Sequence, residues 1–119
     1  MGVKEGSVLT AHITVLGQKI MLLNGYVEMP FNESISFVVP CKTQREIDFY
    51  WKKLTAGGGK RVQCAWAIDK FGVGWQIVPV DFDKSNASKN KEKKEAMTFV
   101  MRKMKKFDIK KLSAAFENA

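Results

Sequence analysis

The stretch SISFVVPCKTQREIDFYWKKL, residues 34–54, changes its hydrophobic period in the middle, and this change indicates the fold class. Residues 34–39 form a short apolar run typical of a strand. We expect the strand to end at Pro40, because proline cannot donate to a β-ladder. After residue 43 the apolar side chains recur at helical spacing, at Ile47, Tyr50, Trp51 and Leu54. A strand that leads into an amphipathic helix predicts a domain of mixed α and β structure.

The ends of this helix carry their own signals. Thr43 and Glu46 have the spacing of a capping box, in which each side chain accepts a hydrogen bond from the other residue's backbone N–H. Three consecutive glycines, residues 57–59, are typical of a helix end. We therefore expect the helix to begin just after Thr43 and to end before residue 57.

Four further stretches alternate in the manner of half-buried strands, with every second side chain apolar. They are residues 8–16, 19–24, 62–68 and 73–78. Only Gly17 and Gln18 separate the first two, which predicts an antiparallel hairpin. The last two are joined by a turn at residues 69–72. The predicted order is three strands, a helix and two strands.

A helical tail is predicted after the last strand. Residues 81–90 are rich in Ser, Asn and Lys and indicate a linker. Residues 91–107 carry apolar side chains along one stripe and predict a helix, and Asp108 can cap a last short helix. We therefore predict one α+β domain over residues 1–119, with a helical tail at residues 91–117.

The composition is that of a soluble globular protein, with 119 residues, of which 45% are hydrophobic and 27% charged. No apolar run approaches the roughly 20 residues that span a bilayer, and the first residues lack the apolar core of a secretory signal. The two cysteines, Cys41 and Cys64, are interpreted as free thiols of a cytoplasmic protein. Most of the net charge of +8 arises in residues 81–119, which hold eleven Lys or Arg against six Asp or Glu.

Three blocks of this sequence, in this order, resemble the PhnB-like proteins. They are FNESISFVV at 31–39, TQREIDFYWKKL at 43–54, and CAW at 64–66 with DKFGVGWQIVP at 69–79. On these residues the chain is identified as a member of the "3-demethylubiquinone-9 3-methyltransferase" type of glyoxalase-like proteins, within the vicinal-oxygen-chelate superfamily. The resemblance covers residues 6–116.

The resemblance implies a fold. Members have the glyoxalase/bleomycin-resistance-like fold, in which two βαβββ modules curl around a concave pocket. This sequence holds the second module and only the last two strands of the first, so the opening strand, helix and strand have no counterpart. The remaining hairpin would have an unpaired edge and an uncovered apolar face. We therefore predict a homodimer, with strand exchange between chains as one form of it; a shortened sequence is the alternative.

The resemblance also implies where metal ligands would lie. Metal-dependent members carry His or Glu at equivalent strand positions, and those positions hold Met21, Ser34 and Gln76 here. A thioether, a hydroxyl and an amide are poor ligands for the divalent ions of such sites. We therefore expect no metal in this protein.

Within this fold, alternate strand residues would face the pocket. The candidates are Asn24, Ser36, Cys64, Trp66 and Gln76, with Glu33 and Asp69 at strand ends. Turn or cap roles for the two acids, and a core role for Trp66, are the simpler interpretations. Trp75 lies on the opposite strand face from Gln76 and is expected beneath the helix. His12 is a candidate base, although a hydrogen-bonded or solvated histidine is the simpler interpretation.

Amides, hydroxyls and aromatic rings suit the binding of a small polar aromatic molecule. The expected function is therefore small-molecule binding, with a metal-independent lyase or isomerase as its enzymatic form. Methyl transfer is not expected, because the sequence has no Gly-rich strand-turn-helix to hold a nucleotide-like cofactor, and we expect no cofactor. The alternative is a non-catalytic structural protein.

A second alternative is a nucleic-acid-binding module that uses the basic tail. Its cations are dense and could attract phosphates: Lys89, Lys91, Lys93, Lys94, Arg102, Lys103, Lys105, Lys106, Lys110 and Lys111. The favoured interpretation is that they form a solvated face behind a docking stripe of Met97, Val100, Met101 and Met104. No recognition-helix motif supports specificity, so nucleic acid is not an expected partner.

Overall fold

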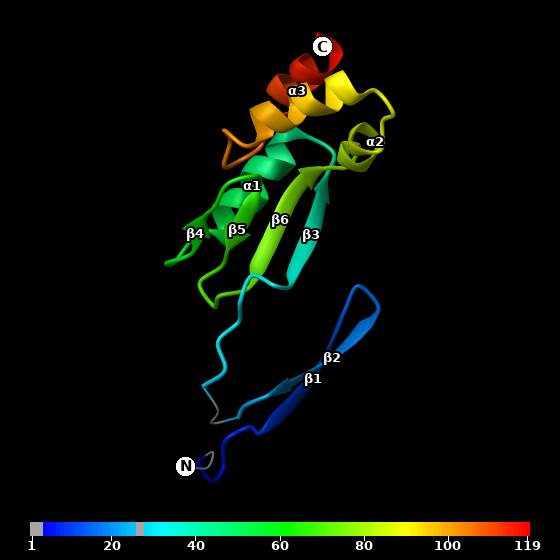
Figure 1. Cartoon of the computed structure of the whole chain (residues 1–119). Helices are drawn as coiled ribbons and strands as arrows, with labels where there is room; N and C mark the ends of the chain where they lie inside the picture. Colours follow the sequence, from blue (N-terminus) through cyan, green and yellow to red (C-terminus); the bar gives the residue numbers. More distant parts are fainter. Residues whose placement is uncertain (1–3, 26–27) are drawn as a thin grey trace. The chain divides into compact units, whose positions relative to one another are not determined.

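The computed structural model describes residues 4–25 and 28–119 (Figure 1). The chain divides into two compact units, residues 1–30 and 31–119. The first contains a hairpin, and the second contains a sheet with the helices. The fold class is therefore mixed α+β, as predicted. Among the described residues no helix is both long and apolar enough to cross a membrane.

The first unit is the predicted antiparallel hairpin. Strand β1 (Thr10–Val15) pairs with β2 (Gln18–Leu23), with Ile13 opposite Ile20. The turn lies at Leu16 and Gly17, one residue earlier than expected. Both have positive φ, 49° and 78°, as a two-residue turn of type I′ requires.

The second unit is built on a four-stranded sheet. Its elements are β3 (Ser36–Cys41), α1 (Gln44–Leu54), β4 (Lys60–Arg61), β5 (Trp66–Ile68) and β6 (Gly74–Pro79). The strand order is β3-β6-β5-β4, with β3 parallel to β6 and the other pairs antiparallel. The chain thus runs β-α-β-β-β, and α1 supplies the crossover that two parallel strands need.

Helix α1 covers one face of this sheet. Its cap lies at Thr43, as predicted, where the Thr43 Oγ1 accepts from the Glu46 N–H at 3.2 Å. The Glu46 carboxylate accepts in return from the Lys42 N–H, and not from the Thr43 N–H as a capping box requires. The core beneath the helix consists of Cys41, Ile47, Trp51, Ala67 and Ile77, and Trp75 packs against it as expected.

Two strand predictions need correction. Strand β3 continues through Pro40 to Cys41. Proline is tolerated there because β3 is an edge strand, with one side free of ladder bonds. The predicted strand 62–68 is instead a hairpin: β4 and β5 flank a turn in which Cys64 and Ala65 have positive φ, 58° and 66°. Apolar alternation alone could not reveal this reversal.

The tail also differs from its prediction. The expected linker 81–90 contains a short helix, α2 (Phe82–Asn86). The expected helix 91–107 ends at Met101, as α3 (Lys91–Met101), and α4 (Ile109–Glu117) follows the predicted Asp108 cap. Helices α2 and α3 lie beyond the carboxyl ends of β3 and β6 (Figure 1). A second core forms there from Ala65, Val78, Met97, Phe107 and Leu112.

Candidate functional site

The sheet face opposite α1 carries the polar strand residues. Val39, Ala67 and Ile77 point into the core beneath α1, so their strand neighbours point to the other side. The pairing sets Val38 beside Gln76 and Trp66 on the other flank of Gln76. This open face therefore collects side chains from three strands: Ser36, Val38, Trp66, Gly74 and Gln76.

Two of these side chains are joined directly. The Gln76 Nε2 donates to the Ser36 Oγ at 2.8 Å. Within the described residues, the side-chain oxygen of Gln76 (Oε1) and the hydroxyl proton of Ser36 have no protein partner. The pair can therefore offer one acceptor and one donor to a bound molecule.

Trp66 borders this pair, because the pairing of β5 with β6 sets it opposite Gln76. A Cβ built on Gly74 would lie 3.7 Å from the Trp66 Cζ3 and 3.4 Å from the Ser36 Cβ, so the indole edge lies over this backbone. Val38 beside it is 58% exposed, which leaves the face accessible. The site thus combines an aromatic ring with an amide and a hydroxyl, the residue types that orient small polar aromatic ligands.

Asp69, another candidate, holds a turn on the other side of the sheet. Its carboxylate accepts hydrogen bonds from the Phe71 N–H at 2.9 Å, the Val73 N–H at 3.0 Å and the Trp75 indole N–H at 3.0 Å. Burial by itself raises the pKa of Asp69, but these donors, the indole first, together hold the pKa below its usual range. Its side chain is engaged in turn chemistry rather than on the Ser36–Gln76 face.

Cys64 was expected on a strand facing the pocket, and that placement is wrong. Its left-handed backbone turns it toward the tail, where its N–H donates to the Met104 carbonyl at 2.9 Å. Its Sγ lies 3.7 Å from the Met101 carbonyl oxygen. Glu33 is exposed in the turn before β3.

Asn24 and His12 belong to the hairpin unit. The Asn24 Nδ2 donates to the Val8 carbonyl at 3.1 Å and closes the open end of the hairpin. His12 lies on β1 opposite Met21. These two candidates therefore belong to the hairpin, and the candidates that the four-stranded sheet brings together are Ser36, Trp66 and Gln76.

The positions implied for metal ligands do not fit a divalent ion. Met21 presents a thioether that is 57% exposed, the Ser34 Oγ hydrogen-bonds to the Asn32 Oδ1, and Gln76 contributes an amide to Ser36. Across residues 4–25 and 28–119, no three His, Cys, Asp or Glu side chains gather to form a ligand set.

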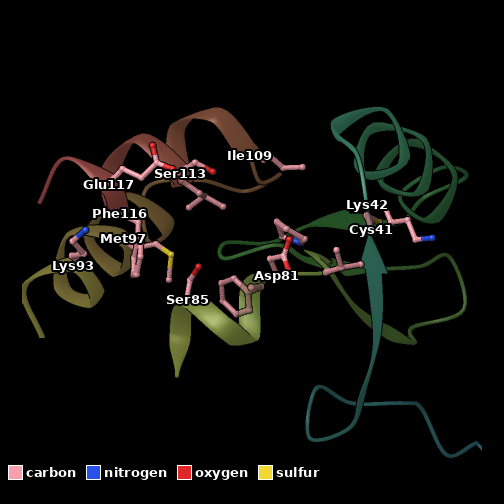
Figure 2. A pocket seen from close by; sticks show the side chains of 14 residues that line it. Cys41, Lys42, Asp81, Ser85, Lys93, Met97, Ile109, Ser113, Phe116 and Glu117 are labelled. Atoms are coloured by element: carbon pink, nitrogen blue, oxygen red, sulfur yellow. The ribbon is translucent and has the colours of Figure 1, made fainter. Parts of the chain in front are cut away.

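A cavity that sequence reasoning missed lies between the sheet ends and the tail helices. Figure 2 shows it, with a volume of about 370 Å³, lined on one side by Met97, Ser113 and Phe116 and on the other by Asp81 and Cys41. The sequence signal that could have indicated this cavity was Phe82, an aromatic residue within a polar segment, which lines it. Its ring packs at a tilt of 38° against the Phe107 ring, with 5.8 Å between the ring centroids, and so anchors α2 to the tail.

Comparison with known proteins gives one family and one structure of note. A family model described as 3-demethylubiquinone-9 3-methyltransferase matches residues 1–78. A solved structure of a PhnB protein from Bacillus cereus is 32% identical, covers 63% of this chain and 67% of its own, and has a TM-score of 0.47. A search of curated proteins found no significant match.

Proposed function

Because the chain belongs to the 3-demethylubiquinone-9 3-methyltransferase family of PhnB-like proteins, we propose that it is a glyoxalase-like protein that binds a small molecule without a metal. The ligand would lie on the sheet face of Ser36, Trp66 and Gln76. A small polar aromatic molecule suits this face, because the indole offers a stacking surface and the amide and hydroxyl offer directed hydrogen bonds.

The hydrogen bond between Gln76 and Ser36 is the observation that carries this proposal. In metal-dependent members the position of Gln76 holds a carboxylate. An amide cannot act as a general base, and it is a poor substitute for a carboxylate on a divalent ion. The open face therefore offers binding groups, and no described residue on it offers a base that could activate the Ser36 hydroxyl, which favours binding without methyl transfer.

The β-α-β-β-β order of the second unit supports the glyoxalase-like fold. In this order the strand after the crossover helix lies at the far edge, and β3 pairs with β6. One module of this kind has a single open face. The family fold would curl that face around a ligand with the help of a second module.

An NMR titration with catechol tests the ligand site. Catechol carries an aromatic ring and two adjacent oxygens, so we expect it to shift the Gln76 side-chain amide and the Trp66 indole signals. The Trp75 indole lies on the other sheet face and serves as an internal control. Trp66→Ala should abolish the shifts. Shifts confined to the Trp75 face, or a full response in Trp66→Ala, would refute the site.

Metal analysis of the purified protein tests the second part of the proposal. We expect no stoichiometric zinc, iron, manganese or nickel. A metal bound one to one would contradict the assignment of Met21, Ser34 and Gln76 as non-ligating positions. Gln76→Glu is the matched variant, because it restores the carboxylate and should raise the affinity for added manganese.

We further propose that a second copy of the chain covers the hairpin. On one face of β1 and β2 the apolar side chains of Ile13, Val15, Ile20 and Leu22 remain between 39% and 50% exposed. Such a face on a two-stranded ribbon is marginal in water unless something covers it. Sedimentation of the full chain should therefore give a dimer.

Charge placed on one face of the hairpin tests this dimer. Ile13→Lys should shift the chain toward the monomer, whereas Thr14→Lys, on the opposite face of the same strand, should leave the dimer intact. A wild-type chain that sediments as a stable monomer would rule out the homodimer.

A further inference from the structure

The second unit has two shallow basic hollows. The first, of about 700 Å³, lies along α3 and is lined by Lys89, Lys91, Lys94 and Arg102. The second, of about 460 Å³, lies beside α1 and β4 and is lined by Lys52, Arg61, Lys105 and Lys106. We call the two together the basic strip.

Charge on the basic strip is strongly unbalanced. Its eight cations face two carboxylates, Glu95 and Asp48, so the strip carries six of the chain's eight excess positive charges. Each carboxylate already has a partner, since Lys91 lies 3.7 Å from Glu95 and Lys106 lies 2.8 Å from Asp48. In the described parts of the chain the other six cations have no ion-pair partner. Like charges gathered in this way repel one another, and a polyanion would relieve that repulsion.

The segment 102–106 supplies lining residues to both hollows. Arg102 lines the first hollow and Lys105 the second, and three peptide steps of 3.8 Å limit their Cα separation to about 11 Å. The segment is held to the sheet, because the N–H groups of Cys64 and Ala65 donate to the carbonyls of Met104 and Lys105 at 2.9 and 2.8 Å. The basic strip is therefore a surface fixed by backbone hydrogen bonds. It is assembled from four parts of the chain: Lys52, Arg61, residues 88–102 and residues 105–106.

An exposed aromatic ring lies within the first hollow. Phe99 lines it and is 62% exposed, with the Lys103 ammonium 3.9 Å from its ring centroid. Met97 is buried on the opposite side of α3, so the helix turns its apolar stripe inward and Phe99 outward. An aromatic ring among cations is the arrangement on which bases of a single strand stack.

We propose that single-stranded nucleic acid binds along the basic strip, with its phosphates on the lysines and arginines and a base on Phe99. The hollows are shallow and no described element projects into a groove, which disfavours duplex recognition. A membrane surface is disfavoured because the apolar stripe of α3 faces the protein. The lysines of the tail thus have more than the solvating role expected from sequence. This inference is independent of the ligand site on the sheet.

Fluorescence anisotropy with a labelled oligothymidylate tests the proposal. Binding should weaken with salt, with a slope in log Kd of about 0.7 for each phosphate contacted. Lys94→Ala/Arg102→Ala should lower that slope by about 1.4. Lys110→Ala/Lys111→Ala removes the same charge from α4, outside both hollows, and should bind as the wild type does.

Phe99→Ala tests the stacking contact and should weaken binding about fivefold or more. Phe71→Ala is the matched control, because Phe71 is also exposed beneath a lysine, with the Lys70 ammonium 5.1 Å from its ring, but lies outside both hollows. If Lys94→Ala/Arg102→Ala and Lys110→Ala/Lys111→Ala lost equal affinity, net charge alone would explain the binding, and the proposal would be overturned. Binding to phosphatidylserine vesicles without binding to the oligonucleotide, or no binding at low salt, would also overturn it.

Discussion

The side chain of Gln44, in the first turn of α1, holds the backbone of Phe107. Its Nε2 donates to the Phe107 carbonyl at 2.9 Å, and its Oε1 accepts from the Ile109 N–H at 2.9 Å. One amide therefore joins the start of α1 to the start of α4, across more than sixty residues of sequence. This clamp sets where the tail lies against the sheet.

Removing the clamp should destabilise the protein. Gln44→Met keeps the length of the side chain but leaves the Phe107 carbonyl and the Ile109 N–H without that partner, at an expected cost of about 1–3 kcal/mol. Urea unfolding measures this cost. Gln63→Met is the control, because Gln63 is exposed and makes one long hydrogen bond of 3.4 Å to the Arg102 carbonyl. Equal losses in the two variants would mean that the clamp adds nothing to stability.

Acid should weaken the turn at Asp69. Because the folded protein lowers the pKa of Asp69, the carboxylate contributes stability that is complete above its unfolded value of about 3.9 and is lost as the pH falls through the folded pKa. Asp69→Asn should therefore be less stable than the wild type at neutral pH, by about 1–3 kcal/mol, with a difference that shrinks in acid. Trp75→Phe removes one donor and should show part of this pH dependence. A difference that stays constant from neutral pH to pH about 2 would contradict the assignment.

The two thiols should differ in reactivity. Burial, with a smaller contribution from the Glu46 carboxylate, raises the pKa of the Cys41 thiol, and its side chain is fully buried. Since the thiolate is the reactive form, iodoacetamide should label Cys64 faster than Cys41 in the native protein. Mass spectrometry after timed labelling measures both rates. In urea the two rates should converge, and faster labelling of native Cys41 would argue against this packing.

Gly59 should not tolerate a side chain. A Cβ at this position would lie 2.7 Å from the Ile68 carbonyl oxygen and 2.9 Å from the Thr55 backbone, so Gly59→Ala forces α1 and β5 apart. We expect a loss of about 1–3 kcal/mol, measured by thermal or urea unfolding. Gly25→Ala is the control, since a Cβ there meets no atom within 4 Å, and it should have little effect. A stable Gly59→Ala variant would show that this close approach can relax.

Local sequence predicted the elements whose reasons are local. The alternation of residues 8–24 predicted the hairpin, and the change of period at Thr43 predicted α1 with its cap. The Asp108 cap was also predicted, because its carboxylate accepts from the Lys111 N–H three residues later. Each of these depends on groups within a few residues of one another, so the pattern of a short stretch contains the necessary information.

Residues 62–68 show where local information ends. Their alternation is that of a strand, yet Cys64 and Ala65 adopt left-handed backbone conformations. The cause lies forty residues away, in the Met104 and Lys105 carbonyls that accept their N–H groups. The sequence likewise predicted a helix from residue 91 to residue 107. The helix ends at Met101, and Phe107 packs in the second core.

The residues quoted first, 34–54, determined by themselves a strand and a capped helix, and they supplied part of the pattern that indicates the family. They also named Ser36, but not its partner. Only the parallel pairing of β3 with β6 brings the Ser36 hydroxyl to the Gln76 amide, forty positions later, and sets Trp66 beside them. Strand pairing and the docking of the tail are long-range hydrogen-bonding events, and the periodicity of one segment contains no information about which distant segment completes them.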